Sequence, residues 1–216
     1  MPSSIPTPPS SDTIRRALGE FQLTANDLQV SQIQQYIRTL LAWNEKVNLT
    51  AIREPLEILY RHFCESMYAA NVISLQKGRL ADIGSGGGFP GIPLKIMLPD
   101  MEVFLVESNV KKATFLAEVV RDLQLTGTRV LVSRYEELDE EVAPLNVVCC
   151  RALGEVEPLL AWARSERVGA KETILWIGGR DLEVARRVAG WKWRDPIAIP
   201  QSLRRFLLAG EAITES

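Results

Sequence analysis

From Arg79 onward, short apolar runs alternate with stretches of helical periodicity, and this alternation limits the possible folds more than any other feature of the chain. Parallel strands are connected by helices that pack on the faces of their sheet, so the pattern predicts an α/β fold with a mostly parallel sheet covered on both sides. The predicted strands are Arg79–Ile83, Glu102–Val106, Arg129–Val132, Asn146–Cys150 and Thr173–Ile177. Helices are predicted at about 90–98, 110–124, 134–141, 155–168 and 180–189.

The segments on either side of this alternation have other patterns. Residues 1–12 predict a disordered tail, and residues 13–75 carry apolar side chains at helical spacing, which predicts an N-terminal helical extension. The α/β domain is assigned to residues 76–216. Near its end the apolar runs Ile197–Ile199 and Leu203–Ala209 follow one another without a helix, which predicts a hairpin with an antiparallel strand.

The composition is that of an ordinary globular protein. The chain has 216 residues and a net charge of −2, which excludes a protein that coats nucleic acid through bulk charge but leaves a local basic face open. No apolar run approaches the ~20 residues that a membrane-spanning helix needs. Cys64, Cys149 and Cys150 lack the spacing of a metal site or a disulfide framework. Cys149 and Cys150 lie in an apolar run and are expected as reduced core residues. We therefore expect a cytoplasmic monomer without a metal or a membrane contact.

A glycine-rich segment follows the first predicted strand and opens the next helix. It is Asp82-x-Gly84-x-Gly86-x-Gly88-Phe89. At the carboxyl end of a strand, glycines let a ligand approach the backbone and adopt positive φ angles. The third glycine of a dinucleotide fingerprint would stand at position 89, which is phenylalanine. The spacing is instead similar to that of S-adenosylmethionine (SAM) methyltransferases, which makes Asp82 and the three glycines predicted cofactor-binding residues.

Glu107 ends the second predicted strand, 23 residues after Gly84. A carboxylate at this place can accept hydrogen bonds from both ribose hydroxyls of a bound nucleoside. Enzymes that use NAD share the feature, so Glu107 supports a nucleoside ligand without choosing between the two cofactors.

Six segments, in this order, resemble the ribosomal RNA small-subunit methyltransferase G family, also called GidB. They are Trp43–Arg53 (WNEKVNLTAIR), Arg61–Ser66 (RHFCES), Asp82–Pro93 (DIGSGGGFPGIP), Val106–Leu116 (VESNVKKATFL), Ser133–Glu137 (SRYEE) and Cys150–Ala152 (CRA). The chain departs from the family pattern at Glu65, where an aspartate is usual, and at Ile177, where a lysine commonly precedes the glycine.

The resemblance implies a Rossmann-like, SAM-dependent methyltransferase fold with a seven-stranded sheet and an N-terminal helical extension. It also implies a bacterial enzyme that uses SAM to methylate N7 of one guanine, at position 527 of 16S rRNA. The substrate would be free 16S rRNA or the small ribosomal subunit. Carried over motif by motif, the cofactor contacts are Gly84, Phe89, Tyr135, Glu136 and Arg151. Ser108, which follows Glu107, is also a predicted cofactor-binding residue.

This reaction requires no general base. Guanine N7 has an in-plane lone pair and no proton, so the enzyme must mainly align N7, the methyl carbon and the sulfur. The only histidine, His62, is expected to have a structural or positioning role. Arg151 is the predicted catalytic residue because it ends the fourth strand, where an arginine can hold guanine O6 or a phosphate. An ion pair with a neighbouring carboxylate is the alternative for Arg151.

Basic residues concentrate near the C-terminus. Residues 179–205 contain seven basic and three acidic side chains, and RNA binding depends on contacts to phosphate. The predicted RNA-binding residues are Arg186, Arg187, Arg204 and Arg205, together with Lys111 and Lys112 after Glu107. Trp191 and Trp193 lie in the same segment and either stack on bases or pack in the core.

Two other functions remain open from the sequence. One is a SAM-dependent methyltransferase that acts on a small molecule or a protein, and the other is a nucleotide-binding regulatory module that does no chemistry. The helical extension and the basic segment favour the RNA substrate over the first of these, and transfer of a tritiated methyl group to small-subunit RNA would distinguish an enzyme from the second.

Overall fold

The structure is a computed structural model that describes residues 6–72, 77–138, 142–151 and 154–213. Its sheet contains the strands β1 (Arg79–Ile83), β2 (Glu102–Val106), β3 (Thr128–Leu131), β4 (Val147–Arg151), β5 (Glu172–Gly178), β6 (Trp191–Trp193), β7 (Ile197–Ala198) and β8 (Arg205–Ala212). The longer helices are α1 (Ser11–Glu20), α2 (Asp27–Asn44), α4 (Glu65–Val72), α5 (Gly91–Met97), α6 (Val110–Asp122), α7 (Val156–Arg164) and α8 (Gly179–Arg187). Shorter pieces are α3 (Pro55–Ile58), the π-helical η1 (Leu59–Cys64) and the 3₁₀ turn η2 (Tyr135–Glu137).

The sheet is parallel from β3 to β5 and antiparallel beyond β5. Its order is β3-β2-β1-β4-β5-β8-β6, with β7 also paired to β8. Because β5 occupies one edge of β8, β6 and β7 share the other edge, where they pair with different parts of the strand. The sheet is therefore seven strands wide although eight strands are described. The predicted α/β class, the mostly parallel sheet and the terminal antiparallel hairpin are confirmed.

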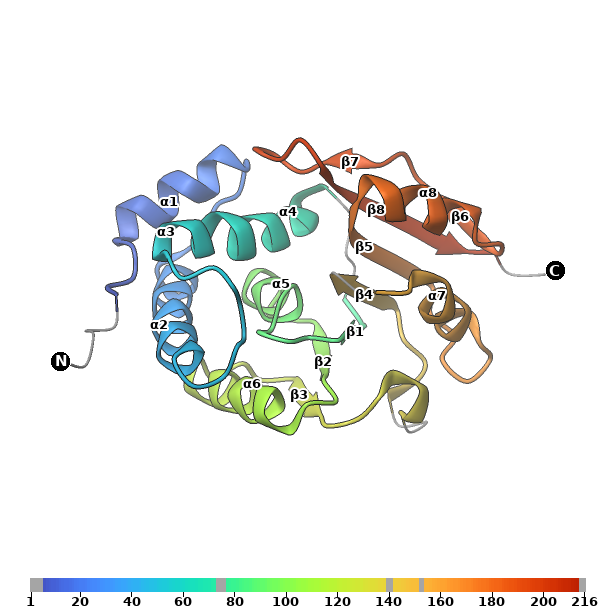
Figure 1. The fold of residues 1–216 in the computed structure, drawn as a ribbon, viewed down its shortest axis with the longest axis horizontal. Helices are drawn as coiled ribbons and strands as arrows, with labels where there is room; N and C mark the ends of the chain where they lie inside the picture. Colours follow the sequence, from blue (N-terminus) through green and yellow to red (C-terminus); the bar gives the residue numbers. More distant parts are fainter. Residues whose placement is uncertain (1–5, 73–76, 139–141, 152–153, 214–216) are drawn as a thin grey trace.

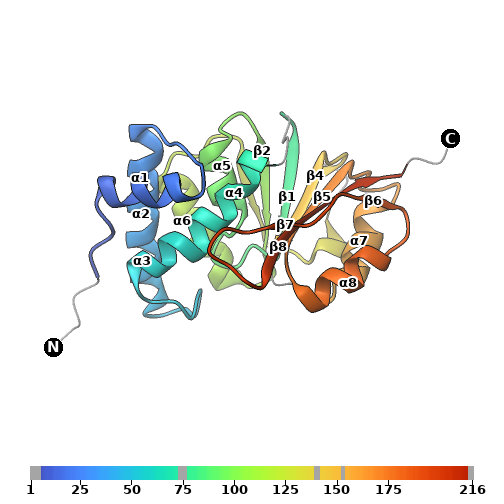
Figure 2. The same ribbon diagram turned by 90° about the horizontal axis from the view of Figure 1, so that it is seen from above.

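Helices cover both faces of the sheet. Figure 2 shows α1–α6 on one face and α7 and α8 on the other. Alternate residues of β1 belong to the two cores, with Leu80 in the cluster under α1–α6 and Ala81 in the cluster under α7 and α8. The chain changes direction across the sheet between β1 and β4, and in such sheets the crevice at that point is the usual ligand site.

The helices before β1 form as their sequence predicts. Asn26 caps α2 in a capping box with Gln29, and Pro55 occupies the first turn of α3. Helix α1 begins at Ser11, with Ser10 as its N-cap, so it starts slightly earlier than the sequence pattern indicates. Residues 1–5 of the predicted tail lie outside the described residues. No helix in the described ranges is long and apolar enough to cross a membrane.

Candidate active site

The glycine loop closes over the carboxyl end of β1. Gly84, Gly86 and Gly88 have φ angles of 70°, 55° and 85°, which residues with a side chain rarely adopt. The fully buried carboxylate of Asp82 accepts a hydrogen bond from the backbone N–H of Gly91 at 3.0 Å. Burial raises the pKa of Asp82 to about 7. Asp82 thus connects the end of β1 to the start of α5 beneath the glycine loop. It does not line the cavity of about 210 Å³ that lies at the ends of β1–β3.

Glu107 faces the loop from the end of β2. Its Oε2 accepts the backbone N–H of Gly86 at 2.9 Å, and its Oε1 accepts that of Asn109 at 2.8 Å. Each carboxylate oxygen has a second acceptor position. The same side chain therefore fixes the loop and can still receive ribose hydroxyls.

A cavity of about 210 Å³ lies at these strand ends. Five predicted cofactor-binding residues line it, namely Gly84, Glu107, Ser108, Tyr135 and Glu136. Ser133 and Arg134 line it as well, although the sequence assigned them no role. A carboxylate, a glycine backbone and a tyrosine ring around a small cavity are groups suited to a nucleoside, so these residues fit the adenosine end of SAM.

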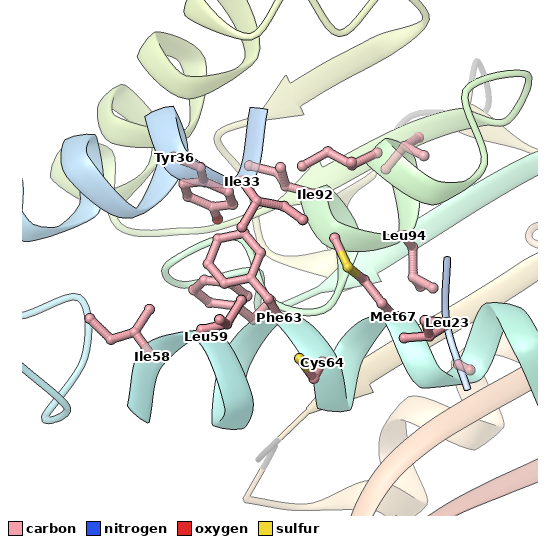
Figure 3. Close-up of a cluster of buried hydrophobic side chains, with 14 of the residues drawn as sticks. Leu23, Ile33, Tyr36, Ile58, Leu59, Phe63, Cys64, Met67, Ile92 and Leu94 are labelled. Carbon is pink, nitrogen blue, oxygen red and sulfur yellow. The ribbon is translucent and has the colours of Figure 1, made fainter. Parts of the chain in front are cut away.

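Phe89 lies beneath the loop in an aromatic stack. Its ring centroid is 5.3 Å from that of Tyr36, nearly parallel to it, and 4.7 Å from that of His62. The Tyr36 hydroxyl donates a hydrogen bond to the backbone carbonyl of Gly87. Figure 3 shows Tyr36 of α2 beside Phe63 of η1. The sequence missed this brace because the spacing of Tyr36 reveals only that the residue faces a core.

His62 belongs to the loop region in space, although it lies outside that region in sequence. Its Nε2 is 2.7 Å from the Thr50 hydroxyl. Burial, together with Arg151 and Arg61, lowers the pKa of His62 to about 3. The imidazole is therefore neutral near pH 7 and serves as a packing and hydrogen-bonding group, which agrees with the structural or positioning role predicted for it.

Three arginines converge on the buried carboxylate of Glu65. Arg205 contacts it through Nε at 3.0 Å and Nη2 at 2.5 Å, Arg151 through Nη2 at 3.2 Å, and Arg61 through Nε at 3.5 Å. The indole N–H of Trp176 donates to the backbone carbonyl of Glu65 at 2.8 Å. The ion pair considered as an alternative for Arg151 is thus present, and Arg205 is half-buried in the same cluster.

A second cavity, of about 840 Å³, opens beside this cluster at the ends of β4 and β5. Arg151 and Arg205 both line it. Arg151 Nη1 is buried without a hydrogen-bond partner among the described residues. A guanidinium that is held on one side by Glu65 and has a free N–H on the other is suited to bind an oxygen of a guanine or a phosphate.

The basic C-terminal segment divides into two groups. Arg205 pairs with Gly178 at the carboxyl end of β5, so Arg205 and the exposed Arg204 lie at the edge of the sheet that carries the cavities. Arg186 and Arg187 end the nine-residue α8, which begins after Gly178 and runs about 12 Å back toward the opposite edge. The structure does not bring these four predicted RNA-binding residues together.

Several other predicted residues have clear positions. Lys111 is exposed and Lys112 half-buried in the first turn of α6, at the edge that carries the cofactor cavity. Trp191 is 5% exposed and packs against Trp193, which favours the core alternative for both rings. Cys149 and Cys150 are free and buried, as expected, and Cys64 is free and buried as well. Within the described residues, no group of three or more His, Cys, Asp or Glu side chains could hold a metal ion.

Comparison with known proteins identifies a family. The model of the family described as rRNA small subunit methyltransferase G (GidB) matches residues 29–189. Two relatives named ribosomal RNA small subunit methyltransferase G come from Desulfitobacterium hafniense and Chloroflexus aggregans. The first is 42% identical over 138 residues, which cover 62% of this chain and 57% of the relative. The second is 41% identical over 188 residues, which cover 85% of this chain and 73% of the relative.

Among solved structures, a SAM-dependent methyltransferase from Aquifex aeolicus is similar in fold. It superposes with a TM-score of 0.56 at 15% identity, over 77% of this chain and 97% of the other. At this level of identity the likeness shows the methyltransferase fold alone, which agrees with the fold expected from the sequence.

Proposed function

The chain belongs to the rRNA small subunit methyltransferase G family, and from this premise we propose that it transfers the methyl group of SAM to N7 of one guanine of 16S rRNA, at position 527. One observation carries the assignment of the site. The nucleoside-sized cavity at the ends of β1–β3 and the arginine-lined cavity at the ends of β4 and β5 open at the same edge of the sheet, on either side of the point where the strand order reverses. A cofactor and a base held there would meet between β1 and β4.

The cofactor side of the site belongs to the glycine loop and Glu107. When bound, SAM supplies an electrophilic methyl group. Glu107 and Tyr135 hold the nucleoside, and the glycine backbone allows it to lie close to the loop. The brace of Phe89, Tyr36 and His62 keeps the loop in place before the cofactor arrives.

The base side of the site needs orientation but no proton acceptor. Guanine N7 carries no proton that must be removed. His62, which stacks on Phe89, has a pKa of about 3 and is not needed as a base. Arg151 binds O6 or a phosphate of the target nucleotide, which leaves the N7 lone pair free to face the methyl group. Glu65 positions Arg151 by fixing one side of its guanidinium.

The substrate is 16S rRNA, either free or within the small ribosomal subunit, and the enzyme acts as a cytoplasmic monomer. Four of the predicted RNA-binding residues lie on the edge of the cavities, namely Arg204, Arg205, Lys111 and Lys112, and Arg205 also pairs with Glu65. A polyanion that crosses this edge would pass both cavities.

The decisive experiment is single-turnover transfer of tritiated methyl from SAM to small-subunit RNA, followed by mass spectrometry of the nucleosides. We expect 7-methylguanosine at one position. Arg151→Ala should reduce the rate at least a hundredfold, while the salt dependence of RNA binding changes little because only one contact is lost. Methyl transfer to another atom, or none to RNA by the wild-type protein, would overturn the proposal.

A further inference from the structure

A groove between α2 and α6 is separate from both cavities of the active site. It encloses about 840 Å³, and its lining includes Arg38, Trp43 and Lys46 from α2 and the turn after it, together with Lys111 and Glu118 from α6. We refer to it as the α2–α6 groove. Figure 1 shows the two helices side by side at the outer face of the molecule.

The groove carries uncompensated positive charge. Arg38, Lys46 and Lys111 are exposed, and none of them forms an ion pair within the described parts of the chain. Glu118 is the only carboxylate in the lining, and its Oε1 already accepts the indole N–H of Trp43 at 2.9 Å. Three exposed cations that lack an ion-pair partner among the described residues favour an anionic ligand.

The spacing of the cations indicates a ligand with several anionic groups. Arg38 and Lys46 are eight residues apart on or just after α2, which corresponds to about 12 Å along the helix axis. A single phosphate would not span this separation unless both side chains bent toward it, whereas successive phosphates of a chain would reach both. Trp43 lies between them and is half-buried, so part of its indole is accessible for contact with a base.

The groove is connected to the active site by the polypeptide itself. Helices α2 and α6 are antiparallel, since Gln35 near the middle of α2 bonds to the carbonyl of Asp122 at the end of α6. The end of α2 therefore meets the start of α6, three residues after Glu107. From the end of α2 the chain continues to Thr50. Asn44 holds the backbone of Thr50 through hydrogen bonds, and the Thr50 hydroxyl contacts His62.

We propose that the α2–α6 groove binds the phosphodiester backbone of the RNA substrate, with Arg38, Lys46 and Lys111 in contact with successive phosphates. The groove would hold a strand next to the nucleotide that enters the active site. This inference rests on the proposed function for the identity of the RNA, but the groove itself is defined by its own residues.

The test compares two triple variants. Arg38→Gln/Lys46→Gln/Lys111→Gln removes the cations of the groove, and Arg186→Gln/Arg187→Gln/Lys192→Gln removes the same charge from exposed positions in α8 and β6. Affinity for a small-subunit RNA fragment is measured over a range of salt concentrations. The groove variant should bind at least tenfold more weakly at low salt, and its slope of log affinity against log salt should be shallower by about two, since each single-strand phosphate contact contributes about 0.7.

Calorimetry with SAM controls for folding, since no residue of the groove lines the cofactor cavity. At saturating RNA the groove variant should recover the wild-type single-turnover rate. A wild-type slope in the groove variant, or a loss confined to the α8 and β6 variant, would overturn the inference even while the wild-type protein methylates RNA. Binding of an acidic protein in place of RNA would leave the RNA slope unchanged and would also overturn it. If the wild-type protein failed to methylate RNA, that result would overturn the proposed function and not the assignment of the groove.

Discussion

At the scale of single residues, two buried carboxylates beside the active site are stabilised in opposite ways. Glu65 is surrounded by the guanidinium groups of Arg61, Arg151 and Arg205. Asp82 has no cation partner among the described residues and accepts a backbone hydrogen bond from Gly91 and a weak one from the thiol of Cys149. A charged carboxylate is costly in such a place, which is why the pKa of Asp82 is raised to about 7.

The raised pKa predicts how stability depends on pH. Between about pH 4 and pH 7, folded Asp82 keeps a proton that the unfolded chain releases, so its contribution is complete below pH 4 and is lost as the pH rises toward 7. Asp82→Asn keeps an acceptor for Gly91 and does not titrate. In urea unfolding from pH 4.5 to 8, the wild-type free energy of unfolding should fall relative to the variant by about 3 kcal/mol, at 1.36 kcal/mol per pKa unit. Parallel profiles for the two proteins would contradict a buried, protonated Asp82.

Residue positions were predictable where strand ends determine them. Glu107, Ser108 and Tyr135 line one cavity because the ends of neighbouring parallel strands meet at the same edge. The contacts of Glu65 with Arg151 and Arg205 were not predictable, because these arginines lie 86 and 140 residues further along the chain. The contact of His62 with Phe89 was not predictable either, because Phe89 lies in the glycine-rich segment after β1. Only packing of the extension onto the sheet brings them together.

At the scale of elements, the glycine loop is shaped by the helices around it as much as by its own sequence. A Cβ atom at Gly88 would lie 2.2 Å from the Tyr36 hydroxyl and 2.7 Å from Ile92 Cδ1, whereas one at Gly86 would have no neighbour nearer than 3.7 Å. Both glycines have positive φ angles. An alanine would therefore be strained in its backbone at either position, but only at Gly88 would its Cβ atom also collide with neighbouring side chains.

Alanine variants at Gly86 and Gly88 therefore separate the cost of backbone strain from the cost of a steric clash. Gly86→Ala should reduce the free energy of unfolding by about 1 kcal/mol through its backbone conformation alone. Gly88→Ala should lose a further 1–3 kcal/mol, roughly, because Tyr36 and Ile92 must move. Urea denaturation of the two variants measures the difference. Equal losses of unfolding free energy in the two variants would show that Tyr36 of α2 does not pack tightly against the glycine loop.

The elements themselves were predictable where apolar runs are long. β1 and β2 have the expected bounds, and β3, β4 and β5 differ by one residue at their ends. The helix expected at 134–141 was wrong, since Tyr135–Glu137 form one 3₁₀ turn, Leu138 is extended, and residues 139–141 lie outside the described residues. β6 was missed because its three residues form a strand only by pairing with β8.

At the scale of the whole molecule, the helices before β1 and the sheet share one core. Phe63 and Met67 belong to the same buried cluster as Leu94 of α5 and Leu105 of β2, and Figure 3 shows Phe63, Met67 and Leu94 together. Gln29 of α2 also donates a hydrogen bond to the carbonyl of Ile96 in α5. The division of the sequence at residue 75 separates two patterns of periodicity, and we infer that it does not separate two units of stability.

This inference predicts a single unfolding transition for the whole chain. Hydrogen exchange measured by mass spectrometry at increasing urea should give the same midpoint for peptides from residues 27–44 and from residues 102–106, because unfolding α2 would expose Tyr36 and its neighbours and remove the support of the glycine loop. Saturating SAM should then raise both midpoints together, since a ligand that binds only the folded chain stabilises every part of a cooperative unit. A lower midpoint for α2, or a shift by SAM that is confined to the strand, would show instead that the helical extension folds and unfolds independently of the sheet.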